Sequence, residues 1–113
     1  MVTIREYLDP SGRCPFGRWF AGLNATAAAK VTTAMVRIEQ GDFSNTKGVG
    51  AGVHESRIDF GPGYRIYFGK DGDTIVILLG GSIKKRQTKD ILAAQKCWND
   101  YKQRKAEETQ PCR

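Results

Sequence analysis

The sequence predicts a single α+β domain with the element order β-α-α-β-β-β-α and an antiparallel sheet. Three observations predict this fold. The length of 113 residues suits one domain, apolar stripes of helical period precede residue 41, and three β-rich runs follow within residues 53–79. The two helices form a hairpin that is expected to cover one face of the sheet. We expect the domain to span residues 1–105 and residues 106–113 to form a disordered tail.

The N-terminal part contains one strand and the two helices. Val2–Tyr7 alternates and is rich in β-branched residues, which predicts a strand. Pro15 is suited to the first position of a helix that runs through Leu23, and Asn24 is suited to cap a second helix ending near Gln40. One face of that second helix carries Ala28, Val31, Met35 and Ile38.

The first hairpin has a Gly61–Gly63 turn. A three-residue loop there pairs Asp59 with Arg65 and Arg57 with Tyr67. A slip of one residue would mix polar and apolar side chains on both faces, so this register is favoured.

The second hairpin is predicted from Asp71-Gly72, a two-residue turn signal that pairs Phe68 with Ile75. The two registers together sort the strand residues onto two faces. The face toward the helical hairpin is predicted to carry Ile58, Phe60, Tyr64, Ile66, Phe68, Ile75, Ile77 and Leu79. The other face, expected to be partly open, is predicted to carry Glu55, Arg57, Asp59, Arg65, Tyr67, Val76 and Leu78.

A last helix is predicted from Lys89 to Lys105, capped by Thr88. Its packing stripe consists of Ile91, Ala94, Trp98 and Tyr101. The basic segment Ser82–Gln87 connects it to the last strand and emerges at the open face.

The net charge of +6 is unevenly distributed. Residues 1–80 hold 9 Lys/Arg and 8 Asp/Glu, whereas residues 81–113 hold 9 Lys/Arg and 4 Asp/Glu. A local excess of this kind attracts polyanions or an acidic protein partner. Lysines are also common on solvated helix faces that bind no partner. This alternative interpretation applies to Lys89, Lys96, Lys102 and Lys105.

Several classes of protein are excluded by the composition. No apolar run approaches the roughly 20 residues of a membrane span, and Arg5, Glu6 and Asp9 stand where a signal peptide is apolar. The three cysteines are far apart and form no CxxC pair, so neither a disulfide framework nor a metal site is indicated. We therefore expect a cytoplasmic protein with reduced thiols and no cofactor.

The charged residues of the first hairpin allow two interpretations. In the first, Asp59 and Arg65 form only a cross-strand salt bridge and Arg57 is solvated. Alternatively, the arginines bind phosphate oxygens and Tyr67 stacks on a base, which together favour an RNA-binding surface. His54, the only histidine, has a structural role or reaches a substrate from the strand end.

Short motifs along the chain are Glu55-Ser56-Arg57-Ile58-Asp59, Gly61-Pro62-Gly63-Tyr64-Arg65, Leu79-Gly80-Gly81, Lys84-Lys85-Arg86-Gln87 and Asp90-Ile91, with Leu8-Asp9, Pro15-Phe16 and Trp19 nearer the N-terminus. With these motifs the sequence closely resembles the RelE/HigB-like toxins of bacterial type II toxin–antitoxin modules, within the RelE/ParE superfamily. It most resembles the addiction module killer proteins of that group. The motifs occur in the family's order and extend the resemblance to about Arg104.

The resemblance implies a RelE-like fold and a toxin that cleaves mRNA on the ribosome without a metal. Arg65 would clamp the phosphate and Arg57 would stabilise its developing charge, while Lys84 or Lys85 would act as base or electrostatic partner. The RNA-binding residues would be Tyr67, Arg86, His54 and Lys89.

The resemblance also implies partners: the ribosome, mRNA and a cognate helix-turn-helix antitoxin, with no membrane involved. Two alternatives stay open. The ParE-like branch shares the fold and inhibits DNA gyrase, and a basic RNA- or protein-binding module without catalysis would use the same charged surface.

Overall fold

The computed structural model describes residues 1–109, which form an α+β domain with one five-stranded sheet. The strands are β1 (Thr3–Glu6), β2 (Thr46–Gly48), β3 (Val53–Ile58), β4 (Tyr64–Asp71) and β5 (Ile75–Ile83). The helices are α1 (Pro15–Ala21), α2 (Ala25–Glu39), the 3-10 helix η1 (Lys84–Arg86) and α3 (Gln87–Thr109). The strand order is β1-β5-β4-β3-β2.

Local capping interactions fix where the first two helices begin. Pro15 is the first residue of α1, where its missing N–H costs nothing. The Asn24 side chain accepts a hydrogen bond of 2.9 Å from the Ala27 N–H, so the predicted cap of α2 is confirmed.

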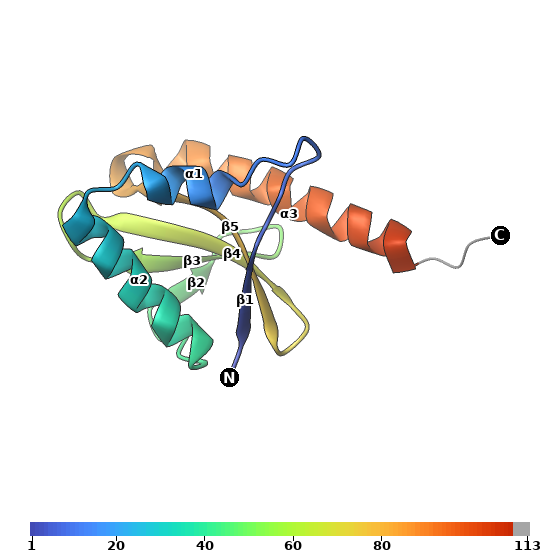
Figure 1. Ribbon diagram of the computed structural model, residues 1–113, viewed down its shortest axis with the longest axis horizontal. Helices are drawn as coiled ribbons and strands as arrows, with labels where there is room; N and C mark the ends of the chain where they lie inside the picture. The colour runs from blue at the N-terminus through green and yellow to red at the C-terminus, as the bar shows by residue number, and fades with distance from the viewer. Residues whose placement is uncertain (110–113) are drawn as a thin grey trace.

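The sheet is buried on both faces. Helices α1 and α2 cover one face, and the long helix α3 covers the other and extends past the sheet (Figure 1). The first core contains Phe16, Ala27, Val31, Ile38, Ile58, Tyr64, Ile66, Phe68, Val76 and Leu78. The second contains Tyr7, Val53, Tyr67, Ile77, Leu79, Ala94 and Trp98.

The predicted partly open face was therefore wrong. Val53, Ile77 and Leu79 give that face enough apolar surface for α3 to pack on it. The predicted packing stripe of α3 is confirmed, because Ala94 and Trp98 are buried in this core and its other two residues lie against it.

The sheet is mixed rather than antiparallel. β1 lies parallel to β5, with Thr3 opposite Ile75 and Glu6 opposite Leu78. No tight turn joins β1 to its neighbour, so the sequence held no local signal for its direction. The short edge strand β2 was also missed, since its sequence Thr-Lys-Gly has no β-rich run.

The register of β3 and β4 differs from the prediction by two residues. Arg57 lies opposite Arg65 and Ile58 opposite Tyr64, so the loop comprises residues 59–63. A shift by an even number leaves every side chain of both strands on its predicted face.

The register of β4 and β5 differs by three residues. Asp71 pairs with Ile75 across a three-residue turn, and Phe68 pairs with Leu78 rather than Ile75. The pairing is irregular opposite Tyr67 and Phe68. Because the shift is odd, the residues of β5 before this irregularity lie on the face opposite to the predicted one. The prediction failed because nearly all of this strand's early residues are apolar, so no polar position fixed its orientation.

Helix α3 is longer than predicted at both ends. It begins at Gln87 directly after η1 and continues to Thr109. Residues 106–109, predicted as tail, are therefore helical, whereas residues 110–113 lie outside the described part of the chain. Among the described residues, no helix has the length and apolar character needed to cross a membrane.

Polar contacts attach α3 to the β4–β5 turn and to the residue that follows β1. The Tyr101 hydroxyl donates a 2.6 Å hydrogen bond to Asp71, which also pairs with Lys105. The Tyr7 hydroxyl donates one of the same length to Asp100. These contacts fix the helix axis relative to β1 and to the β4–β5 turn.

Gly69→Ala is expected to destabilise the domain by about 2 kcal/mol through overpacking. A Cβ at this position would lie 2.4 Å from Cε3 of Trp98, which occupies the space left by the missing side chain. Urea denaturation followed by circular dichroism measures the change. Gly48→Ala is the matched control, because its Cβ would meet nothing within 4 Å, and an equal loss in both variants would contradict the account.

Asp71→Asn is expected to reduce the loss of stability in acid. Hydrogen bonds from Lys105 and Tyr101 lower the pKa of the Asp71 carboxyl. Its stabilising effect is therefore present above the unfolded pKa of about 4 and is lost as the pH falls through the lower folded value. We expect a difference below about 1 kcal/mol at neutral pH that vanishes near pH ~2. Melting temperatures of both proteins across this range test it; parallel curves would contradict it.

Candidate functional site

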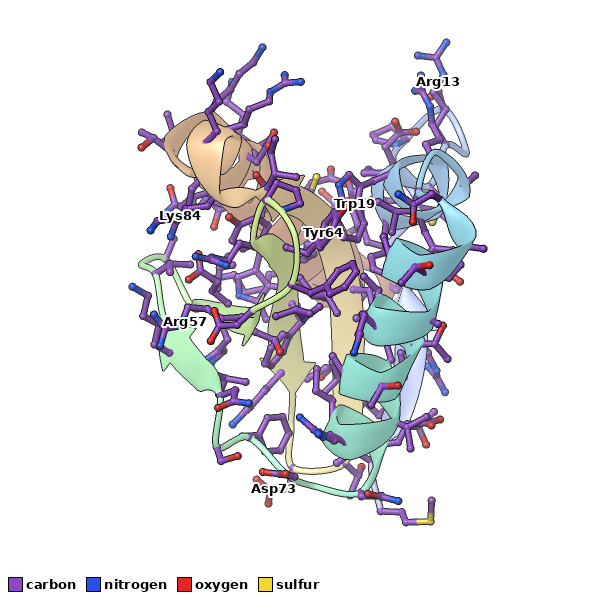
Figure 2. All side chains as sticks on the ribbon, turned by 90° about the vertical axis from the view of Figure 1, so that its left-hand side faces the viewer. Arg13, Trp19, Arg57, Tyr64, Asp73 and Lys84 are labelled. Atoms are coloured by element: carbon purple, nitrogen blue, oxygen red, sulfur yellow. The ribbon has the colours of Figure 1, made fainter. Side chains whose placement is uncertain are left out.

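A polar pocket of about 390 Å³ lies at the end of the sheet where β3, β4 and η1 meet. It is lined by Arg57, Asp59, Phe60, Gly61, Pro62, Gly63, Arg65 and Lys84. Figure 2 shows Arg57 and Lys84 on the same side of the molecule, away from α2. We call it the cationic pocket, because it has three basic side chains and one acidic one.

The glycine loop holds Lys84 at the pocket. Gly61 and Gly63 have φ values of 55° and 79°, a conformation that favours glycine. The Gly63 carbonyl accepts a 2.7 Å hydrogen bond from the Lys84 N–H, which ties the start of η1 to the loop. A Cβ at residue 63 would lie 3.3 Å from Cβ of Lys84.

Two arginines face each other across the central strands. Arg57 and Arg65 are directly opposite in the β3–β4 register, and both line the cationic pocket. Like charges at directly opposite positions destabilise a sheet. An anion between them would remove this repulsion, so the arrangement is suited to bind a phosphate group.

Arg65 forms an ion pair with a buried carboxylate, that of Glu55. Its Nε lies 3.7 Å from Oε1 of Glu55, and its Nη1 donates a 3.1 Å hydrogen bond to the Tyr64 carbonyl. The predicted salt bridge between Asp59 and Arg65 was therefore wrong. The two-residue register shift places Asp59 in the loop, where it is exposed at the pocket wall.

Tyr67 was predicted to contact RNA and is unavailable for this. Its side chain is 0% exposed beneath α3. Burial, and then the negative charge of Glu55, raise the pKa of its hydroxyl well above the usual value. The prediction failed because it left this face of the sheet open.

His54 lies apart from the cationic pocket. Its ring stacks on Phe68 at 5.4 Å between centroids, on the face covered by α2. Burial, and then the positive charge of Lys70, lower its pKa. This supports the structural interpretation of His54 over contact with a substrate in the pocket.

The remaining predicted residues are exposed around the helix start. Lys85 and Arg86 belong to η1, and Lys89 lies in the first turn of α3. Arg86 lines a separate hollow of about 330 Å³ together with Trp19 and Asp90. Of the predicted site residues, the cationic pocket thus unites Arg57, Arg65 and Lys84.

Two residues of the site were missed by the sequence interpretation. Glu55 is fully buried, and its Oε2 accepts a 2.7 Å hydrogen bond from Nε2 of Gln87. A signal for Glu55 did exist, because strand alternation placed it on the same face as Arg57 and Arg65. Gln87 carried no such signal, since its contact depends on where α3 docks.

Within residues 1–109, no group of three or more His, Cys, Asp or Glu side chains is arranged to hold a metal ion. The chemistry available at the pocket is electrostatic. Arginine and lysine there can bind an oxyanion and stabilise negative charge.

The fold and the pocket together define a small α+β protein with a cationic pocket at one end of its sheet. No model of a known protein family matches the chain. An uncharacterized protein of Haemophilus influenzae is 41% identical over 81 residues, which cover 71% of this chain and 82% of that protein. The chain belongs to the family of this Haemophilus protein.

Inorganic phosphate is expected to stabilise the protein through the two facing arginines. At about ten times its Kd, phosphate should raise the free energy of unfolding by ~1.4 kcal/mol. Arg57→Gln should be up to ~0.5 kcal/mol more stable than the wild type without phosphate and respond to it less than half as strongly. Denaturation at matched ionic strength measures both effects.

The control for this prediction is Arg13→Gln, which removes an exposed arginine from the loop before α1. Figure 2 shows Arg13 on the opposite side of the view from Arg57 and Lys84. Equal phosphate responses in the wild type and in Arg57→Gln would contradict the assignment of the anion site.

Proposed function

We propose that this protein is a cytoplasmic RelE/HigB-like toxin of a type II toxin–antitoxin module that cleaves mRNA in the ribosomal A site. The observation that carries the proposal is the direct opposition of Arg57 and Arg65 in a pocket completed by Lys84. The order of helices and strands and the motifs resembling this family support a RelE-like topology for the chain.

The proposed reaction is attack of a ribose 2′-OH on the adjacent phosphorus. The new bond gives a 2′,3′-cyclic phosphate, and the bond to the 5′-oxygen of the next nucleotide breaks. Arg65, held by its buried partner, clamps a non-bridging phosphate oxygen, while the exposed Arg57 neutralises charge as it develops.

Proton transfer is assigned to the lysines. Lys84 lines the pocket, and Lys85 follows it in the same exposed turn. One of them removes the 2′-OH proton or acts as an electrostatic partner, and the leaving 5′-oxygen takes its proton from the other lysine or from solvent water. Arg86 and Lys89, exposed close by, contact the phosphates of flanking nucleotides.

A cognate helix-turn-helix antitoxin is the proposed inhibitory partner. A pocket with three cations and one carboxylate offers an acidic segment of such a protein favourable electrostatics. Covering the pocket would hold the toxin inactive by excluding RNA.

Arg57→Ala and Lys84→Ala are each expected to lower mRNA cleavage about 100-fold or more, because each removes a charge that stabilises the transition state. Cleavage is read by toe-printing in a reconstituted translation reaction with the purified protein. Both side chains are exposed, so the fold should be unaffected. Arg13→Ala is the matched control and should cleave like the wild type.

Three outcomes separate this function from the alternatives. Cleavage that persists in Arg57→Ala and Lys84→Ala contradicts the proposed site. Absence of cleavage with inhibition of gyrase supercoiling indicates the ParE-like branch. RNA binding with neither effect indicates a basic binding module without catalysis.

A further inference from the structure

A small polar cluster lies buried between the sheet and the first turn of α3. It consists of Glu55 and Tyr67, which face each other across β3 and β4, together with Arg65 and Gln87. Glu55 and Tyr67 are 0% exposed and Arg65 is 5% exposed. Charged side chains are rarely buried to this degree in a domain of this size.

The cluster is incompletely satisfied. Within the described residues, Oε1 of Glu55, Nε of Arg65 and the hydroxyl of Tyr67 have no hydrogen-bond partner. Glu55 and Arg65 still form an ion pair at 3.7 Å. Well-packed apolar residues often stabilise a core as well as or better than such a pair, so stability alone does not account for it.

We infer that Glu55 is the positioning residue of the cationic pocket, an inference that rests on the proposed RNA-cleaving function. Glu55 does not line the pocket, so it acts through its neighbours. Its two carboxylate oxygens engage two different elements that each supply a cation to the pocket.

The first element is β4. Oε1 of Glu55 faces Nε of Arg65, and the Tyr64 carbonyl accepts a hydrogen bond from Nη1. These contacts restrict the rotation of the guanidinium plane. Nη1 would lie 3.5 Å from a Cβ at Gly63, which places this end of the side chain beside the glycine loop.

The second element is the junction of η1 and α3. Oε2 of Glu55 accepts the hydrogen bond from Gln87, the residue directly after Lys84–Arg86. The other end of η1 is tied to the loop by the bond from the Lys84 N–H to the Gly63 carbonyl. Glu55 thereby links the position of Lys84 to the orientation of Arg65.

The decisive variant is Glu55→Gln, which keeps the side-chain shape and an oxygen for Gln87 but removes the charge facing Arg65. On ribosomes programmed with mRNA, we expect its maximal cleavage rate to fall about tenfold or more, because the guanidinium is no longer held in place. The concentration of protein at half-maximal rate should change little, since the pocket keeps all its cations. A role in stability alone would not produce this split.

A second readout does not need cleavage. In side-chain NMR of the arginine Nε–H groups, wild-type Arg65 should give a signal protected from exchange with water, because the side chain is buried and the ion pair with Glu55 holds it there. In Glu55→Gln this protection should fall at least about fivefold while the backbone amide spectrum stays native. If the wild type cleaves no RNA, the proposed function fails, and this measurement still tests the positioning role.

Two further variants complete the test. Gln87→Met removes only the second contact and should lower the cleavage rate without changing the protection of Arg65. Ser56→Ala is the matched control, another buried polar side chain of β3, and should leave both readouts unchanged. Two results for Glu55→Gln would overturn the inference. One is a cleavage rate and an Arg65 protection that both equal those of the wild type. The other is a lower cleavage rate with unchanged Arg65 protection.

Discussion

The buried carboxylate of Glu55 is the point at which the sheet, the last helix and the cationic pocket meet. It is fully enclosed, it pairs with Arg65, and it binds Gln87 at the start of α3. A buried charge that loses its partner is costly, so these three residues constrain one another strongly. The start of α3 therefore cannot shift along the sheet without disturbing the side chain that faces the pocket.

Burial of the sheet on both faces limits where polar chemistry is possible. Helices occupy the two faces, so the exposed strand residues of the described chain lie on the edge strands β1 and β2 and near the ends of β3 and β4. The pocket lies at one such end, where β3 and β4 turn through a loop with two left-handed glycines. Arg57 and Arg65 are neighbours there because the sheet pairs them, at an electrostatic cost that a bound anion would offset.

Local features of the fold were predictable, and long-range ones were less so. The Asn24 cap and the stripe of α3 depend on short spacings and were confirmed. The direction of β1 was not predictable, because no turn joins it to β5. The shared pocket of Arg57, Arg65 and Lys84 follows from strand alternation and from the basic segment after β5. The burial of Tyr67 depends on α3 docking, which no local pattern reveals.

The two tryptophans give the molecule separate fluorescent reporters for its two layers. Trp98 is 5% exposed and lies over Gly69 under α3, so its emission follows the docking of that helix. Trp19 is partly exposed, lies over Gly81 on the opposite layer and borders the hollow that contains Arg86. Two variants, each keeping only one of these tryptophans, could be compared by quenching their fluorescence with a water-soluble quencher. Quenching of Trp98 would report loosening of α3, and quenching of Trp19 would report changes at the hollow that contains Arg86.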